Sequence, residues 1–284
     1  MNEVCPYPSL NKTYCIHQLW WPFTSEASPT PPEKYYQNIL SWIEKNPRAY
    51  HKIWNREDAL QLLQTDYPWF VQKWLDFKQE IQRSDAIRPF ILHKYGGVYA
   101  DMDSVCYQSF EEFMKQAPII IGNEFGNSIL NFFRTKIFLQ NAIFVSRAPH
   151  HPFWIHYANC MNNNENILKA TGPCLLTEAY YSFENKDDIL TVDRKVFYPI
   201  PLSICVFPLA SKFYSKREME SMEFGLKFNK NAMASHQYDG TWKKDQNWRK
   251  TRTNFLFTMV LVIVAIILVL ILSKRKKKNL SIKK

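Results

Sequence analysis

An uncharged apolar segment near the C-terminus is the strongest constraint on this chain. Residues 255–272 (FLFTMVLVIVAIILVLIL) are 18 residues without a charged side chain. A helix rises about 1.5 Å per residue, so this segment would span roughly 27 Å, close to the thickness of the hydrocarbon core of a bilayer. A basic cluster, Lys-Arg-Lys-Lys-Lys, begins at Lys274. We predict a globular domain over 1–254, a single membrane-spanning helix over 255–272 and a basic tail over 273–284.

The net charge of +10 is concentrated at this end of the chain. Seven of the 36 basic residues and none of the 26 acidic residues lie in 255–284, so the remaining residues carry a net charge of only +3. A nucleic-acid-binding protein would instead place its basic residues on one face or groove of the folded domain. We therefore expect a membrane, and no nucleic acid, as a partner.

Two signals conflict on which side of the membrane the domain lies. Lys and Arg are denser after the predicted span than before it, which favours a cytoplasmic C-terminus and a lumenal domain. Residues 1–10 have no apolar signal-peptide core, which would leave the domain in the cytosol. The sequon Asn11-Lys12-Thr13 would be used only in the lumen. The six cysteines suit buried thiols, or lumenal pairs such as Cys5 with Cys15.

The domain alternates between strand-like and helix-like segments. Short apolar segments typical of strands lie at 14–20, 49–54, 97–101, 119–122 and 142–146, and helical spacing occurs at 33–46, 56–64, 68–83 and 151–161. This alternation predicts an α/β fold with a mostly parallel sheet. Ligands of such sheets bind beyond the carboxyl ends of the strands. Asp101 and Asp103 lie at one of these ends.

The segment 84–103 (SDAIRPFILHKYGGVYADMD) carries the chemistry. Two acids at i and i+2 on a strand share a face, and a turn at the end of the strand also lets both reach one ion. Mg²⁺ and Mn²⁺ are hard cations that bind carboxylates together with substrate phosphates. Such an ion neutralises the charge on a departing nucleoside diphosphate. The alternative for these two aspartates is a solvated turn.

Several motifs together resemble the DXD-containing glycosyltransferases of family 32, the group of initiating mannosyltransferases and inositol-phosphoceramide mannosyltransferases. The similar segments span roughly 15–242, and they are 16–20 (IHQLW), 84–103, 141–153, Gly172-Pro173, His236 and 240–242 (GTW). The resemblance implies a GT-A-type fold, with a single Rossmann-like domain that binds a nucleotide-sugar. It also implies Mn²⁺ or Mg²⁺ as cofactor.

The resemblance implies site residues as well. Asp101 and Asp103 would be the catalytic pair, with Asp101 on the ribose or sugar and Asp103 on the metal, where His236 would complete the ligand shell. The donor would be bound by Trp20 stacking on the base, by Asp85 and Arg88 on hydroxyls, by Tyr99 lining the pocket, and by the Trp242 indole on the diphosphate. The alternatives are a core role for Trp20, an exposed i, i+3 helix pair for Asp85 and Arg88, a packing role for Tyr99 and a solvated or packed His236.

The function implied is a retaining transfer of a hexose, preferably mannose, from GDP-mannose or a UDP-hexose to a lipid or glycan acceptor at a Golgi- or ER-type endomembrane. One departure from the family is Pro89, where an aromatic residue is usual; proline removes a helix hydrogen bond and predicts a kink or a restart there. Two other functions are open: a haloacid-dehalogenase-like phosphatase with Asp101 as nucleophile, and a non-catalytic membrane-anchored binding protein.

Overall fold

The computed structural model describes residues 12–23, 28–124, 137–200, 218 and 221–239. The chain divides into Met1–Tyr238 and Asp239–Lys284, and every described helix and strand lies in the first unit. No helix within the described residues is long and apolar enough to cross a membrane. The span predicted over 255–272 and Trp242 both lie outside the described residues, so both stay predictions.

A six-stranded mixed sheet forms the centre of the unit, in the order β2-β1-β3-β6-β5-β7. The β1–β2, β1–β3 and β5–β7 pairs are parallel, whereas β6 runs antiparallel to both of its neighbours. The prediction of an α/β fold with a mostly parallel sheet is therefore confirmed. The strands are β1 (Tyr14–Leu19), β2 (Ala49–Trp54), β3 (Gly97–Ala100), β5 (Ile119–Asn123), β6 (Leu139–Ser146) and β7 (Ile189–Val192).

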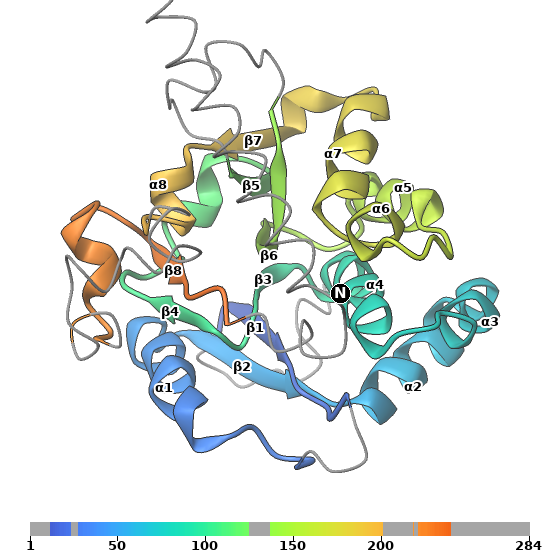
Figure 1. Ribbon diagram of the computed structural model, residues 1–284. Coiled ribbons are helices and arrows are strands. Elements are labelled where there is room, and N and C mark those ends of the chain that lie inside the picture. Colours follow the sequence, from blue (N-terminus) through green and yellow to red (C-terminus); the bar gives the residue numbers. More distant parts are fainter. Residues whose placement is uncertain (1–11, 24–27, 125–136, 201–217, 219–220, 240–284) are drawn as a thin grey trace, which may run out of the picture. The chain divides into compact units, whose positions relative to one another are not determined.

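Helices cover both faces of this sheet (Figure 1). Successive strand side chains point to opposite faces, so Tyr99 and Phe144 join one apolar core while Val98 and Ala100 join the other. The first core takes residues from α2 (Arg56–Asp66), α3 (Pro68–Leu75), α4 (Glu80–Tyr95), α5 (Pro152–Cys160) and α7 (Pro173–Ser182). The second takes residues from α1 (Tyr36–Lys45) and α8 (Arg194–Phe197). The remaining helices among the described residues are α6 (Ile167–Ala170) and the 3-10 turns η1 (Glu33–Tyr35), η2 (Phe113–Gln116), η4 (Lys186–Asp188) and η6 (Phe224–Lys227).

The sequence prediction is wrong for one helix and is narrowed for another. The helix predicted over 68–83 is two helices, because Gln79 is extended and its side chain forms a capping box with Gln82 that begins α4. Helix α4 then continues through Pro89 to Tyr95, so the helix does not restart at the proline, and the kink that was the other expectation there stays a prediction. Phe90 and Ile91, directly after the proline, are fully buried in the first core, and this packing offsets the missing hydrogen bond.

The turn after α4 places β3 against β1. Gly96 and Gly97 both have positive φ values, of 63° and 87°. A side chain at Gly97 would collide with the backbone carbonyl of Cys15 on β1. Glycine is needed here for the conformation and for the close approach, and β3 then runs directly to Asp101.

A short second sheet pairs β4 (Ser104–Cys106) with β8 (Ala234–His236). The pair is antiparallel, with Ser104 opposite His236. Strand β4 begins directly after Asp103, so this pairing brings a residue from the far end of the described chain to the aspartates.

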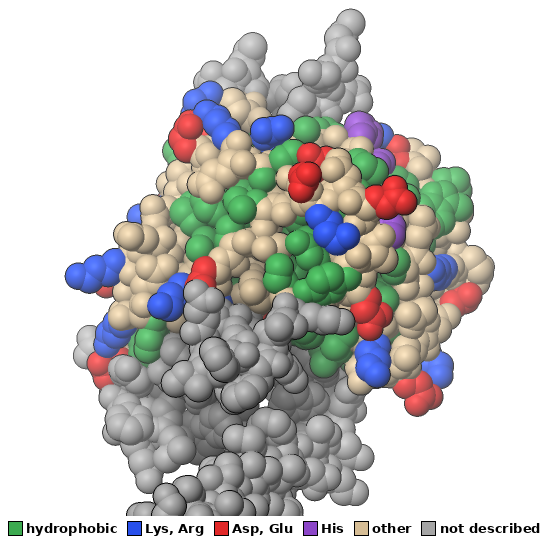
Figure 2. Space-filling view, turned by 90° about the horizontal axis from the view of Figure 1, so that it is seen from above, with side chains coloured by type: hydrophobic (Ala, Val, Ile, Leu, Met, Phe, Trp, Pro, Cys, Tyr) green, Lys and Arg blue, Asp and Glu red, His purple; other side chains and the backbone are tan. Residues whose placement is uncertain are grey.

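The surface and the cysteines add two observations. On the face shown in Figure 2, the described Lys and Arg side chains are interspersed with Asp and Glu, so this face carries no continuous basic surface. Cys106, Cys160 and Cys174 are free thiols, whereas Cys15 is disulfide-bonded. The cysteines therefore include both free thiols and a disulfide-bonded residue, the two possibilities that the sequence left open.

His17 on β1 contacts β2 and the turn before β3 through its two ring nitrogens. Its Nε2 donates to the carbonyl of Gly96 at 3.0 Å, and its Nδ1 accepts from Trp54 Nε1 at 3.2 Å. The side chain is only 1% exposed, and burial lowers its pKa from 6.5 to about 3. A proton on Nδ1 would break the bond from Trp54, so His17 stays neutral in the folded protein.

We expect the free energy of unfolding to fall as the pH is lowered below 6.5, because the unfolded chain then binds a proton at His17 that the folded protein excludes until about pH 3. At pH 5 this one group is expected to cost about 2 kcal/mol. Urea denaturation at pH 7 and pH 5 measures the change. His17→Gln should lose less stability over this range than the unmodified protein, and an equal loss would contradict the assignment.

Candidate active site

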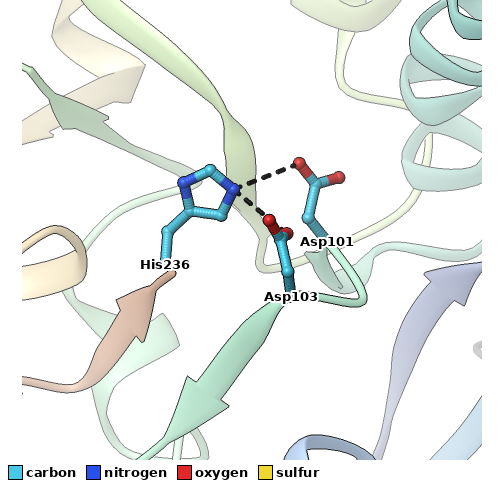
Figure 3. A group of neighbouring side chains, drawn as sticks. All are labelled: Asp101, Asp103 and His236. Carbon is cyan, nitrogen blue, oxygen red and sulfur yellow. Dashed lines mark ion pairs between the residues drawn. The ribbon is translucent and has the colours of Figure 1, made fainter. Parts of the chain in front are cut away.

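The two aspartates lie in a tight turn between β3 and β4. The backbone N–H of Asp101 donates to Ala142 at 2.8 Å, and that of Ser104 donates back to the carbonyl of Asp101 at 3.1 Å. Met102 between them is buried. Both carboxylates therefore point the same way (Figure 3), which is the condition that the sequence argument required.

His236 completes a group of three ligand-type side chains. Its Nε2 lies 3.1 Å from Asp103 Oδ1 and 3.8 Å from Asp101 Oδ2, as Figure 3 shows. The ligand atoms of the three residues all lie within 4.8 Å of one another. Ligands about 2.1 Å from a six-coordinate ion lie about 3 Å apart at neighbouring corners, so the arrangement fits a single divalent ion.

The chemistry of the three donors also fits such an ion. An imidazole nitrogen beside two carboxylates suits Mn²⁺ better than Mg²⁺, which prefers oxygen ligands. Burial alone would lower the pKa of His236, but the neighbouring Asp103 and Asp101 carboxylates outweigh it and the pKa is raised. Metal binding would displace the proton that this ion pair favours.

A buried network of charged and polar side chains holds one oxygen of Asp101 in place. Arg88 contacts Asp101 Oδ1 at 3.0 Å and Asp85 Oδ1 at 2.8 Å, and it donates to the carbonyl of Asn141 at 2.7 Å. Tyr99 donates its hydroxyl to the same Asp101 Oδ1 at 2.6 Å. One oxygen of Asp101 is therefore held by two donors, while Oδ2 faces His236.

The interpretation of Asp85 and Arg88 as an exposed helix pair is wrong. The two residues are 5% and 4% exposed, and the guanidinium lies 4.8 Å from the centre of the Tyr99 ring. Burial raises the pKa of Asp85 to about 6 although Arg88 opposes the shift. Tyr99 has the packing role that was considered for it, since it is 1% exposed. Its hydroxyl also hydrogen-bonds to Asp101.

Trp20 lies at the same edge of the sheet as the aspartates, because β1 and β3 are parallel and both end there. It is half-buried, donates its indole N–H to the carbonyl of Ser28 at 3.2 Å and lies 5.7 Å from the Tyr35 ring. Stacking of Trp20 on a base therefore stays a prediction, as do the donor contacts of Asp85, Arg88 and Tyr99.

Three residues near the site were missed in the sequence. Tyr198 and Tyr238 lie with their rings 6.1 Å and 4.4 Å from His236. Glu124 is 8% exposed, follows β5 and acts electrostatically on His236. A carboxylate directly after a buried strand is the same signal that singled out Asp101, so Glu124 could have been found. Nothing in the sequence around Tyr198 indicates its position.

The phosphatase alternative would need a second acidic pair beside Asp101. The pair considered from the sequence is Asp187-Asp188, in η4. Asp188 instead lies 3.5 Å from His151, and neither residue belongs to the group that Asp101 forms among the described residues.

Comparison with known proteins agrees with the motifs. Residues 32–125 match a family described as glycosyltransferase sugar-binding region containing DXD motif. Inositol phosphoceramide mannosyltransferase 3 of Schizosaccharomyces pombe is 27% identical over 176 residues, which are 61% of this chain and 46% of that protein. Mannosyl phosphorylinositol ceramide synthase SUR1 of Saccharomyces cerevisiae is 24% identical over 168 residues, 54% of this chain and 39% of that protein.

A third relative, inositol phosphoceramide mannosyltransferase 1 of Schizosaccharomyces pombe, is 29% identical over 179 residues, 59% of this chain and 51% of that protein. The chain spans about half the length of these curated relatives or less. The matched family region includes Asp85, Arg88, Asp101 and Asp103. The family match and the relatives confirm the resemblance to DXD-containing glycosyltransferases of family 32.

Proposed function

We propose that the protein is a metal-dependent glycosyltransferase that moves a hexose, preferably mannose, from a nucleoside-diphosphate sugar to a membrane-associated glycolipid or glycan, with retention of configuration. The observation that carries this proposal is the group of Asp101, Asp103 and His236, whose ligand atoms converge at the edge of the sheet. Both aspartates belong to the matched family region, 32–125. A GT-A-type organisation of the domain is part of the same proposal.

In this mechanism Asp101, Asp103 and His236 would hold a divalent ion, Mn²⁺ by preference. When bound, the ion supplies positive charge to the diphosphate as it leaves. Arg88 and Tyr99 orient Asp101 through its other oxygen, at 3.0 Å and 2.6 Å. Because these groups are buried and fixed in advance, little reorganisation is needed as charge develops.

The donor and acceptor are supported by the relatives. Their names describe mannosyl transfer to inositol phosphoceramide, so GDP-mannose and a sphingolipid are the preferred pair. The membrane helix predicted over 255–272 would keep the domain near such an acceptor at an endomembrane. We assign the donor base to Trp20 and the diphosphate to Trp242 as part of the proposal.

The full chain in detergent should release nucleoside diphosphate from GDP-mannose only with Mn²⁺ present, and faster when inositol phosphoceramide is added. UDP-glucose and UDP-galactose are tested in parallel, and a chelator serves as the metal-free control. Release from a UDP-hexose alone would change the donor but keep the class. Absence of release from every donor, together with hydrolysis of a chromogenic phosphate, would refute the proposal in favour of a phosphatase.

A further inference from the structure

We propose that Asn38, on helix α1, is a positioning residue for the metal site: it ties the turn that carries both aspartates to the segment that carries His236. The inference rests on the proposed function, because it concerns the same site. Asn38 is 2% exposed and lies far from the ligands in the sequence, so no motif indicates it.

The side-chain amide of Asn38 uses both of its N–H groups. One donates to the carbonyl of Met102 at 3.2 Å, across 64 positions of sequence, and the other donates to Gln237 Oε1 at 3.1 Å, across 199 positions. Met102 separates the two aspartates, and Gln237 follows His236 directly. A single amide therefore bonds to the immediate neighbour of every ligand.

A backbone bond closes this connection. The N–H of Gln237 donates to the carbonyl of Asp103 at 2.8 Å. The β4–β8 ladder itself has only the three pairs from Ser104–His236 to Cys106–Ala234, and the ligands lie beyond or at its end. A ladder this short leaves the spacing between His236 and Asp103 to the contacts at that end, which Asn38 and Gln237 supply.

Two neighbours of Asn38 on α1 hydrogen-bond the helix to β4. Ser41 accepts a hydrogen bond from the N–H of Cys106 at 2.9 Å, and Trp42 donates to the carbonyl of Ser104 at 3.0 Å. These two residues fix β4 to the helix, while Asn38 reaches past the strand to the turn. A buried amide is costly unless it is hydrogen-bonded, so an apolar residue would serve here if packing were its only role.

Loss of the amide should weaken metal binding more than it weakens the fold. Residues that orient metal ligands typically change metal affinity by about 10- to 100-fold when removed. We expect Asn38→Ala to raise the Kd for Mn²⁺ about tenfold, measured on the full chain from the electron paramagnetic resonance signal of free Mn²⁺. Gln237→Ala should raise the Kd in the same direction, and the double variant should add little to Asn38→Ala because both changes remove one link.

Ser41→Ala is the matched control, since it removes the buried bond from Cys106 on β4 and a bond to the backbone carbonyl of Asn38, but leaves the Asn38 side-chain amide and its two bonds in place. It should lower the melting temperature and leave the Kd for Mn²⁺ within twofold. The inference is overturned if Asn38→Ala and Gln237→Ala also leave the Kd within twofold. If Asn38→Ala fails to fold, the test rests on Gln237→Ala, whose native side chain is only half-buried. A wild-type chain that does not bind Mn²⁺ would refute the proposed metal site and this inference together.

Discussion

Replacing Asp103 by asparagine is expected to lower the rate of sugar transfer roughly a thousandfold while the protein stays folded, because several kcal/mol of charge stabilisation by the metal are lost. The amide has the shape of the carboxylate but not its charge, and Asp103 Oδ1 lies 3.1 Å from His236 Nε2 in the proposed ligand group. The turnover number is measured from released nucleoside diphosphate at saturating donor, and the Kd for Mn²⁺ is measured separately.

Glu112→Gln provides the matched control for this prediction. Its carboxylate is 81% exposed and pairs with Lys115 at the surface, so the same change of charge should leave turnover unchanged. If Asp103→Asn transferred sugar at the wild-type rate with wild-type dependence on Mn²⁺, Asp103 could not be a ligand, and the proposed mechanism would be wrong.

Replacing Arg88 by methionine is expected to lower the free energy of unfolding by about 3–5 kcal/mol, the usual cost of leaving a buried charge without its partner. The guanidinium contacts Asp85 at 2.8 Å and Asp101 at 3.0 Å, and its side chain is 5% exposed. Asp85 already has its pKa raised from 3.8 to about 6 by burial, against the effect of Arg88. Without Arg88 this pKa rises further.

The sign of the pH dependence follows from that shift. A carboxyl group whose pKa is higher in the folded state destabilises the fold as it ionises, so the stability deficit of Arg88→Met should be larger at pH 8 than at pH 5.5. Urea denaturation at both values measures it. Arg48→Met is the control: its pair with Glu111 at 2.7 Å has the arginine 59% exposed, and it should lose less than about 1 kcal/mol.

A second variant separates the buried charge from other effects of removing Arg88. Asp85→Asn combined with Arg88→Met leaves no unpaired charge at position 85 and should recover part of the lost stability. Equal stability of the single and double variants would show that the ion pair is not what Arg88 contributes.

The position of the aspartates was predictable because it depends on local sequence. An apolar strand after two glycines, followed by acids, specifies a strand end, and the structure places Asp101 and Asp103 there on one side of a turn. The location of His236 beside them came from the resemblance and not from spacing, since 133 positions separate it from Asp103 and sequence order does not encode that pairing.

The burial of Asp85 and Arg88 was not predictable from composition. Charged residues on a helix normally mark its exposed face, but α4 buries every residue from Ser84 to Leu92. A helix buried on all sides has no amphipathic period, so the sequence pattern could not show which face meets the sheet. Asn38 was missed because its two partners, the backbone carbonyl of Met102 and the side-chain oxygen of Gln237, are far from it in the sequence.

The pairing of β4 with β8 has a consequence for the order in which the protein assembles. During synthesis the two aspartates leave the ribosome long before Ala234–His236, so a nascent chain cannot offer the complete ligand set. Contacts between such distant positions are the slow ones to form in folding. At the proposed metal site, uptake of an ion would therefore wait until residues 234–236 have been synthesised and have paired with β4, so ion binding would mark a late stage of folding.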